Sequence, residues 1–175
     1  MKVVVPAAGI AARFLPVSHA VPKELLPLGT KPLIHHALEE AEAAGFSSAI
    51  VVLSPRKAAV IRTYFEQDRG LEALLHERGL EEASKALREA AAIAERLNLR
   101  FVEQPSPLGL GDAILRCRDI AGDAFGVLLP DDVVVEGDHW SQLMRLHADT
   151  GAPCLCVRRV RPEQAHRFGI ALCEL

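Results

Sequence analysis

KVVVPAAGIAARFLP, residues 2–16, joins a run of β-branched apolar residues to a loop of small residues. Val3 to Val5 are continuously apolar and stop at a proline, which is typical of a strand buried on both faces of a parallel sheet. The small residues that follow, up to Gly9, leave the backbone little covered by side chains. Since ligands of parallel sheets bind beyond the carboxyl ends of strands, this segment predicts an α/β fold with a binding loop after its first strand.

The rest of the chain alternates strand-like and helical patterns. Because the connections between them are short, we expect an α/β fold with a mostly parallel, Rossmann-like sheet and helices on both faces. A helix is expected from Pro32, at its first helical position, to Gly45, and others from Ser54-Pro55, from Asp112 and around residues 142–147. Further strands are expected at Ala49–Leu53, Leu99–Glu103, Ala124–Leu129, Pro153–Val157 and Phe168–Cys173.

The stretch from Gly70 to Leu97 departs from this alternation. Its apolar spacing predicts two helices separated at Gly79, the second carrying a stripe that includes Leu80 and Leu87. The stripe is too short to favour a coiled coil, so we interpret residues 70–97 as a helical excursion. The excursion would belong to a single nucleotide-binding domain over residues 1–175.

Composition excludes several classes of function. The 175 residues carry a net charge of −3 with a pI near 6.2, which does not indicate a nucleic-acid-binding surface. No apolar run approaches the roughly 20 residues that span a bilayer, and the N-terminus does not resemble a signal peptide. We therefore expect a cytoplasmic protein without membrane or nucleic-acid partners. Cys154-Leu155-Cys156 has neither zinc-finger nor disulfide spacing, so buried free thiols are expected.

The loop after the first strand carries two cations, Arg13 and Lys23. The Arg13 guanidinium can bind a phosphate through two hydrogen bonds, and Lys23 follows a proline that stiffens its segment. Together with the bare backbone of Ala7, Ala8 and Gly9, these cations predict a polyphosphate-binding loop.

The loop does not match either of two common phosphate-binding motifs. A Walker A loop is excluded because Gly-Lys-Ser/Thr is absent. The stretch from Gly9 to Arg13 lacks the second glycine of the dinucleotide fingerprint, and no ribose-binding acid lies about 20 residues further on, which disfavours a dinucleotide oxidoreductase.

A family resemblance becomes specific at this point. PAAGIAARFLP, followed by PKELLPLGTKPLI, resembles the signature of the bacterial UTP–glucose-1-phosphate uridylyltransferases within the sugar nucleotidyltransferase superfamily. The likeness continues in order through five further segments: SPRK at 54–57, LEALL at 71–75, QPSPLGLGDAIL from Gln104, LLPDD from Leu128 and FGI at 168–170.

The resemblance implies transfer of a uridylyl group from UTP to glucose 1-phosphate. Arg13 and Lys23 would be the catalytic residues, which neutralise phosphate charge, and Asp131 would hold Mg²⁺. Nucleotide binding would involve the backbone of Ala7, Ala8 and Gly9, and Gln104 with Gly109 and Gly111 would face the uracil. Gly169 would meet the sugar, and relatives of this kind would form homo-oligomers.

Several positions depart from the family pattern. Ala11 and Ala12 replace a glycine and a threonine of the phosphate loop, Leu108 replaces a lysine, and Asp112 replaces a histidine. Family members also continue well past Phe168, so we expect this chain to lack the C-terminal sugar-binding part. Two alternatives therefore stay open: a related enzyme that uses dTTP or another sugar phosphate, and a nucleotide-binding module without turnover.

Overall fold

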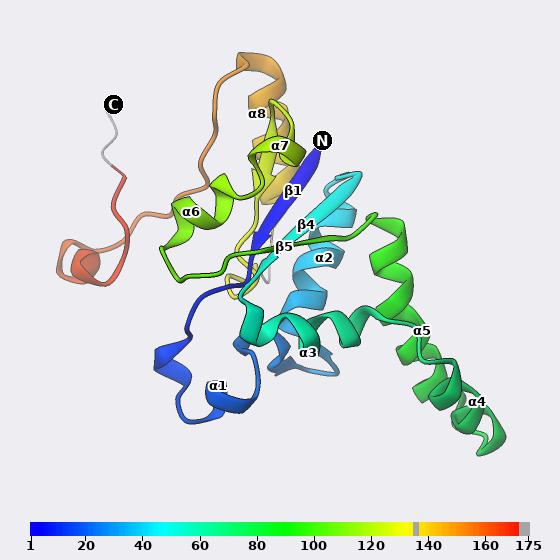
Figure 1. Cartoon of the computed structure of the whole chain (residues 1–175). Helices are drawn as coiled ribbons and strands as arrows, with labels where there is room; N and C mark the ends of the chain where they lie inside the picture. The colour runs from blue at the N-terminus through cyan, green and yellow to red at the C-terminus, as the bar shows by residue number, and fades with distance from the viewer. Residues whose placement is uncertain (135–136, 172–175) are drawn as a thin grey trace. The chain divides into compact units, whose positions relative to one another are not determined.

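Four parallel strands form the central sheet of this protein, seen in a computed structural model that describes residues 1–134 and 137–171 (Figure 1). The sheet order is β5-β4-β1-β6. Their bounds are Lys2–Pro6 for β1, Ser48–Leu53 for β4, Arg100–Glu103 for β5 and Phe125–Val127 for β6. The predicted parallel sheet is confirmed, because every adjacent pair runs in the same direction.

The first unit, residues 1–133, has helices on both faces of this sheet. On one face, Val4 and Ile50 pack with Ala113 and Cys117 from the helical segment formed by α6 (Leu110–Leu115) and α7 (Arg118–Ala121). Because side chains alternate along a strand, Val3 and its odd-numbered neighbours point to the other face. That face meets α2 (Leu33–Ala43), α3 (Pro55–Phe65) and α5 (Glu81–Arg96).

Aromatic contacts identify this second layer. Phe65 of α3 lies against Phe101 of β5, with ring centroids 6.4 Å apart. Phe101 is adjacent in the chain to Val102, which packs into the α6 cluster, so α3 and α6 cover opposite faces of the sheet. The prediction of helices on both faces is therefore confirmed.

The predicted helical excursion consists of α4 (Arg69–Glu77) and α5, separated at Gly79 as expected. Gly79 has a φ of 67°, a backbone conformation that favours glycine. Helix α4 has no buried residue, whereas α5 buries Ala90 and Ile93 in its C-terminal half. The helical hairpin thus extends away from the sheet and is anchored by the end of α5 (Figure 1).

The carboxyl ends of the strands lie at one edge of the sheet. The Ala7 N–H donates to Val52 O at 2.8 Å, and the Gln104 N–H donates to Leu53 O at 2.8 Å. On the other side of β1, the Leu128 N–H donates to Val4 O at 3.0 Å. The chain builds β4 and β5 on one side of β1 and then crosses to place β6 on the other. This reversal makes the end of β1 the topological switch point, where such sheets bind ligands.

The second unit, Val134–Leu175, corrects two predictions. Helix α8 (His139–Thr150) includes the predicted residues 142–147 and begins at Asp138, whose carboxylate accepts the Ser141 N–H. Residues 153–157, however, form no strand, so the strand predicted there is wrong. Cys156 is exposed, so the prediction that the CxC cysteines are buried is also wrong. An apolar run of this kind becomes a strand only where a neighbouring strand completes its backbone hydrogen bonds.

The strand predicted at Phe168–Cys173 is not found over residues 168–171, and its last two positions lie outside the described residues. A short 3-10 helix, Pro162–Arg167, precedes this stretch. Within the part of the chain that the structure describes, no helix combines the length and the apolar character needed to cross a membrane.

A buried histidine of α2 predicts a pH dependence of stability. His35 is 1% exposed, and its Nδ1 lies 2.9 Å from the Tyr64 hydroxyl. Burial lowers the His35 pKa from its ordinary 6.5, although the Glu39 carboxylate opposes that change. The unfolded chain therefore binds the proton first, and the stability present above pH 6.5 is lost as the pH falls through the lowered folded pKa.

We expect the His35→Gln variant, which cannot titrate there, to lose less stability than the parent between pH 7.5 and pH 5. The difference can grow by no more than about 1.4 kcal/mol per pH unit, the slope for one proton. Urea unfolding at both pH values measures it. Equal losses in the two proteins would contradict the assignment to His35.

Candidate functional site

The loop after β1 is built from short turns instead of one long element. It contains two 3-10 turns, Ala12–Phe14 and Lys23–Leu25, with the single helical turn α1 (Val17–Ala20) between them. A small hairpin follows, formed by β2 (Pro27–Leu28) and β3 (Lys31–Pro32). Pro32, predicted at the first helical position of α2, instead caps that helix in extended conformation.

Ala11 is in the left-handed region, with φ 57° and ψ 40°. Its carbonyl accepts the Ser18 hydroxyl at 2.8 Å, which joins the start of the loop to α1. The family pattern has a glycine at this position, and a glycine adopts this conformation without a Cβ penalty. Ala11 therefore carries a Cβ in a backbone conformation that favours glycine.

Replacing Ala11 with glycine is expected to raise the free energy of unfolding by about 1 kcal/mol, because it removes the left-handed Cβ penalty. Ala12→Gly is a matched control: this residue lies in the first 3-10 turn, so its variant should lose up to about 1 kcal/mol through backbone entropy. Chemical denaturation of both variants tests the pair. Loss of stability in both would show that Ala11 is not strained.

The predicted phosphate-binding residues of this loop differ in their surroundings. Ala7 and Ala8 are buried, and the Ala7 N–H donates its hydrogen bond to Val52 O. The expectation of a bare backbone at all three small residues is therefore wrong for Ala7. Gly9 is exposed, with open space where a Cβ would stand. Arg13 is also exposed, and over residues 1–134 and 137–171 the structure shows no hydrogen bond or ion pair from its guanidinium.

Lys23 and Asp131 meet at the sheet edge. They lie 108 residues apart in the chain, and the Lys23 Nζ is 2.5 Å from the Asp131 Oδ2. The lysine side chain is 18% exposed and the aspartate 40%, so both remain reachable from solvent. Lys23, predicted to neutralise phosphate charge, and Asp131, predicted to bind metal, therefore lie side by side.

A buried ion pair lies beneath this loop, and sequence reasoning missed it. Glu24 is 0% exposed, and Lys57 of α3 donates to both of its carboxylate oxygens at 2.9 and 3.1 Å. Lys57 also donates to the Ala7 carbonyl at 3.4 Å. The pair joins the segment that carries Lys23 to the ends of β1 and α3. The motif SPRK contains Lys57, but nothing in the sequence connects it with Glu24.

Gln104 is buried at the end of β5, and its amide nitrogen donates to Gly109 O at 3.0 Å and to Asp112 Oδ2 at 2.8 Å. Gly109 has a φ of 97° and is the N-cap of α6, which begins at Leu110, two residues earlier than predicted. A Cβ at Gly109 or Gly111 would meet open space, so side chains do not cover the backbone there.

A cavity of about 330 Å³ lies beside these residues. Gly9 and Pro22 line it from the first loop, Arg56 and Lys57 from the start of α3, and Gln104 from the loop after β5. Arg56 also holds α1, because it donates to the His19 carbonyl at 2.8 Å. The cavity therefore joins the loops after three strands into one site.

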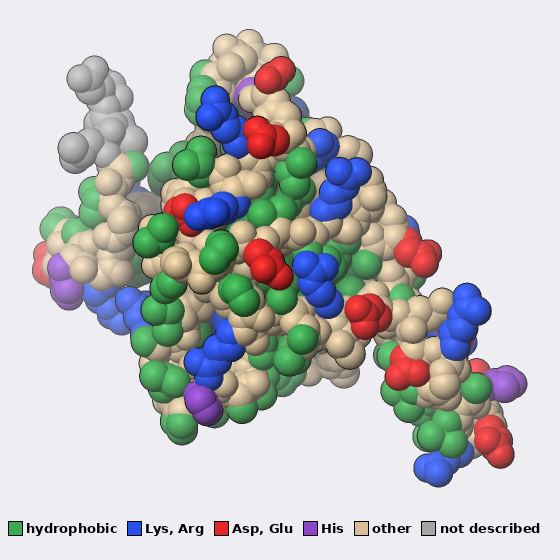
Figure 2. Space-filling view, viewed as in Figure 1, with side chains coloured by type: hydrophobic (Ala, Val, Ile, Leu, Met, Phe, Trp, Pro, Cys, Tyr) green, Lys and Arg blue, Asp and Glu red, His purple; other side chains and the backbone are tan. Residues whose placement is uncertain are grey.

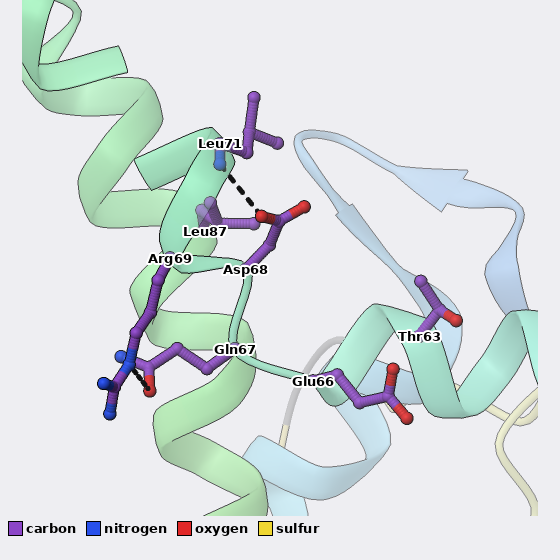
Figure 3. A pocket seen from close by; sticks show the side chains of 7 residues that line it. All are labelled: Thr63, Glu66, Gln67, Asp68, Arg69, Leu71 and Leu87. Atoms are coloured by element: carbon purple, nitrogen blue, oxygen red, sulfur yellow. Dashed lines mark hydrogen bonds between the residues drawn. The ribbon is translucent and has the colours of Figure 1, made fainter. Parts of the chain in front are cut away.

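A second cavity of about 340 Å³ lies at the turn from α3 to α4 (Figure 3). Its polar side chains form hydrogen bonds within the turn. Asp68 accepts the Leu71 N–H at 2.9 Å, and Arg69 donates to Gln67 at 3.4 Å. None of the predicted site residues lines it. We therefore take the cavity beside Gln104, together with the Lys23–Asp131 pair at the same end of the sheet, as the candidate site. Lys23 and Asp131 do not themselves line the cavity.

Two predictions have less support from the structure. Gly169, predicted to meet the sugar, belongs to the second unit and is described there as an exposed residue without regular structure. Among the described residues, no group of three or more histidine, cysteine, aspartate or glutamate side chains is placed to hold a metal ion. Asp131 would therefore need oxygen ligands from the substrate.

These features define a class: an α/β protein whose parallel sheet presents cationic loops at its switch point. The comparisons with known proteins are more specific, because the model of the family described as Nucleotidyl transferase matches residues 2–174. This chain belongs to the nucleotidyl transferase family.

The chain is similar to proteins named UTP–glucose-1-phosphate uridylyltransferase. One from Staphylococcus saprophyticus is 38% identical over 172 residues, covering 97% of this chain and 58% of the relative. One from Bacillus subtilis is 38% identical over 171 residues, covering 97% and 57%. The chain thus spans little more than half the length of these curated relatives.

The chain is also similar to solved structures of proteins with this activity in their names. The UTP-bound UDP-glucose pyrophosphorylase of Acinetobacter baumannii has a TM-score of 0.77 and 35% identity, covering 86% of this chain and 53% of that one. A UDP-glucose pyrophosphorylase complexed with UDP-glucose has a TM-score of 0.69 and 30% identity, covering 86% and 54%. The chain therefore shares its fold with these UDP-glucose pyrophosphorylases.

Proposed function

We propose that this chain is the nucleotide-binding part of an enzyme that transfers a uridylyl group from UTP to glucose 1-phosphate. The observation that carries the proposal is the Lys23–Asp131 pair at the switch point of the sheet, 2.5 Å apart. A cation and a carboxylate side by side suit a site that must neutralise phosphates and hold a divalent metal. The names of the relatives supply the nucleotide and the sugar.

In the proposed reaction, a phosphate oxygen of glucose 1-phosphate attacks the α-phosphorus of UTP. The bond from that phosphorus to the oxygen of the β-phosphate breaks, and pyrophosphate leaves with the electron pair. No enzyme nucleophile is needed, so catalysis consists of positioning and charge neutralisation. Lys23 would neutralise charge near the α-phosphate, and Arg13 would hold the β- and γ-phosphates.

We propose Mg²⁺ as the metal, held by Asp131. The donor set fits: the carboxylate is 40% exposed at the sheet edge, and Mg²⁺ in nucleotide sites takes one or two carboxylates together with phosphate oxygens. When bound, the ion supplies positive charge to the phosphates. The protein's own part would be to hold Asp131 beside Lys23.

The remaining assignments follow the same resemblance. The backbone of Ala8 and Gly9 would approach the phosphates, and Gln104 with Gly109 and Gly111 would bind the uracil. Gly169 would contribute to the sugar site. Charged side chains of both signs are interspersed on the face shown in Figure 2, which agrees with small-molecule substrates instead of nucleic acid. A cytoplasmic location and a homo-oligomeric state remain part of the proposal.

Pyrophosphate release tests the proposal directly. The full-length enzyme that contains this chain is mixed with Mg²⁺ and glucose 1-phosphate, and with UTP or dTTP in separate reactions, with sugar-free reactions as blanks. We expect sugar-dependent release with UTP and a lower rate with dTTP. A higher rate with dTTP would establish the related thymidylyl activity instead.

A nucleotide-binding module without turnover is the second candidate, and Ala11 favours it. Its left-handed backbone carries a methyl group where the family pattern has glycine. Binding of UTP by calorimetry without any sugar-dependent pyrophosphate release would establish this candidate.

A further inference from the structure

The side-chain amide of Gln104 is held in one orientation. Its nitrogen carries two hydrogens, and both are used: one reaches Gly109 O at 3.0 Å and the other Asp112 Oδ2 at 2.8 Å. Its backbone is fixed as well, because the Gln104 N–H donates to Leu53 O. With 3% of the residue exposed, the side chain has little room to adopt another rotamer.

The amide oxygen is the group left for a ligand. Across the part of the chain that the structure describes, the Gln104 Oε1 accepts no hydrogen bond, and it is not among the enclosed polar atoms without a partner. Gln104 lines the cavity of about 330 Å³. The amide therefore offers this cavity an acceptor and no donor.

Asp112 is what prevents the opposite orientation. A carboxylate only accepts hydrogen bonds, so turning the amide over would place Oε1 against the oxygens of Asp112 and Gly109. Hydrogen bonding from Gln104, and then from Arg116, holds the pKa of Asp112 below its usual range, so the carboxylate is ionised at neutral pH. Arg116 lies 3.3 Å from the other carboxylate oxygen and keeps the group in place.

We propose that Asp112 acts through Gln104 to select nucleobases with a ring N–H, uracil over cytosine. The uracil N3–H can donate to the exposed amide oxygen, whereas the N3 of cytosine is an acceptor and would face another acceptor. Asp112 is then a positioning residue for base specificity, at a position where the family pattern has histidine. The inference rests on the proposed nucleotide site.

The test is the ratio of the affinities for UTP and CTP, measured by calorimetry with Mg²⁺ present. We expect the parent to favour UTP and Asp112→Ala to lower that ratio by roughly tenfold, the value of one hydrogen bond to a charged group. Asp112→Glu keeps a carboxylate and should retain most of the ratio. Asp119→Ala, which removes an exposed carboxylate from α7, is the matched control and should leave the ratio unchanged.

The outcomes separate this inference from the proposed function. An unchanged ratio in a folded Asp112→Ala variant would overturn the role of Asp112 and leave the uridylyl proposal standing. Equal affinities of the parent for UTP and CTP would overturn base selection through Gln104 while keeping a nucleotide site. Absence of binding to either nucleotide would overturn both proposals.

Discussion

Replacing Lys23 with alanine in the full-length enzyme is expected to lower kcat/KM for pyrophosphate release by roughly 100- to 1,000-fold, as the loss of one preorganised donor at developing charge does. The lysine is placed for this role: it is 18% exposed at the switch point, and its ammonium group lies beside the carboxylate proposed to bind metal. The α-phosphate and the incoming phosphate carry charge that this cation would neutralise in the transition state.

Lys31→Ala is the control for this prediction. Lys31 lies on β3 of the same loop but pairs with Glu39 of α2, outside the candidate site. Its variant should keep the parental kcat/KM within about twofold, since the pair is exposed and weak. Steady-state rates with UTP and glucose 1-phosphate compare the three proteins. A Lys23→Ala enzyme as fast as the Lys31→Ala enzyme would remove Lys23 from the mechanism.

The Lys57→Met variant is expected to lose about 3–5 kcal/mol of unfolding free energy, because it leaves the carboxylate of Glu24 buried without its cation. Glu24 is 0% exposed, and Lys57 supplies both of its hydrogen bonds. Methionine fills a similar volume, so the loss would come from the charge and not from packing. Urea unfolding followed by circular dichroism measures it.

Two further variants test whether burial of the Glu24–Lys57 pair causes the loss of stability in Lys57→Met. Lys31→Met breaks a pair whose side chains are 37% and 36% exposed, and should cost less than about 1 kcal/mol. The double variant Glu24→Gln/Lys57→Met removes both charges and should recover much of the stability. Equal losses for Lys57→Met and Lys31→Met would show that the Glu24–Lys57 pair is not special.

The sequence predicted the elements of the first unit well, because their signals are local. Each of the four strands of the central sheet overlaps a segment expected to be a strand, and Gly79 separates the two helices of the excursion as expected. Predictions failed where a neighbouring strand was required: residues 153–157 form an apolar run like that of a buried strand but pair with no strand among the described residues. Element boundaries were also inexact, since α6 begins at Leu110 instead of Asp112.

The candidate site was predicted residue by residue but not contact by contact. Lys23, Gln104 and Asp131 were singled out from motifs and from the rule that strand ends share an edge. No pattern could connect Glu24 with Lys57, because an ion pair across 33 residues depends on how the loop folds over α3. Likewise, Asp112 was noticed only as a departure from the family pattern.

By itself, the sequence determined the α/β class, the parallel sheet and the loops that carry its charged residues, since hydrophobic period and turn residues act locally. Only the tertiary structure decided which of those residues meet. In the folded chain Lys23 forms an ion pair with Asp131, and Glu24 forms a buried ion pair with Lys57. The Gln104 amide nitrogen donates a hydrogen bond to Asp112. The reason is physical: hydrogen bonds and ion pairs act over a few ångströms, and the folded path of the chain sets those distances.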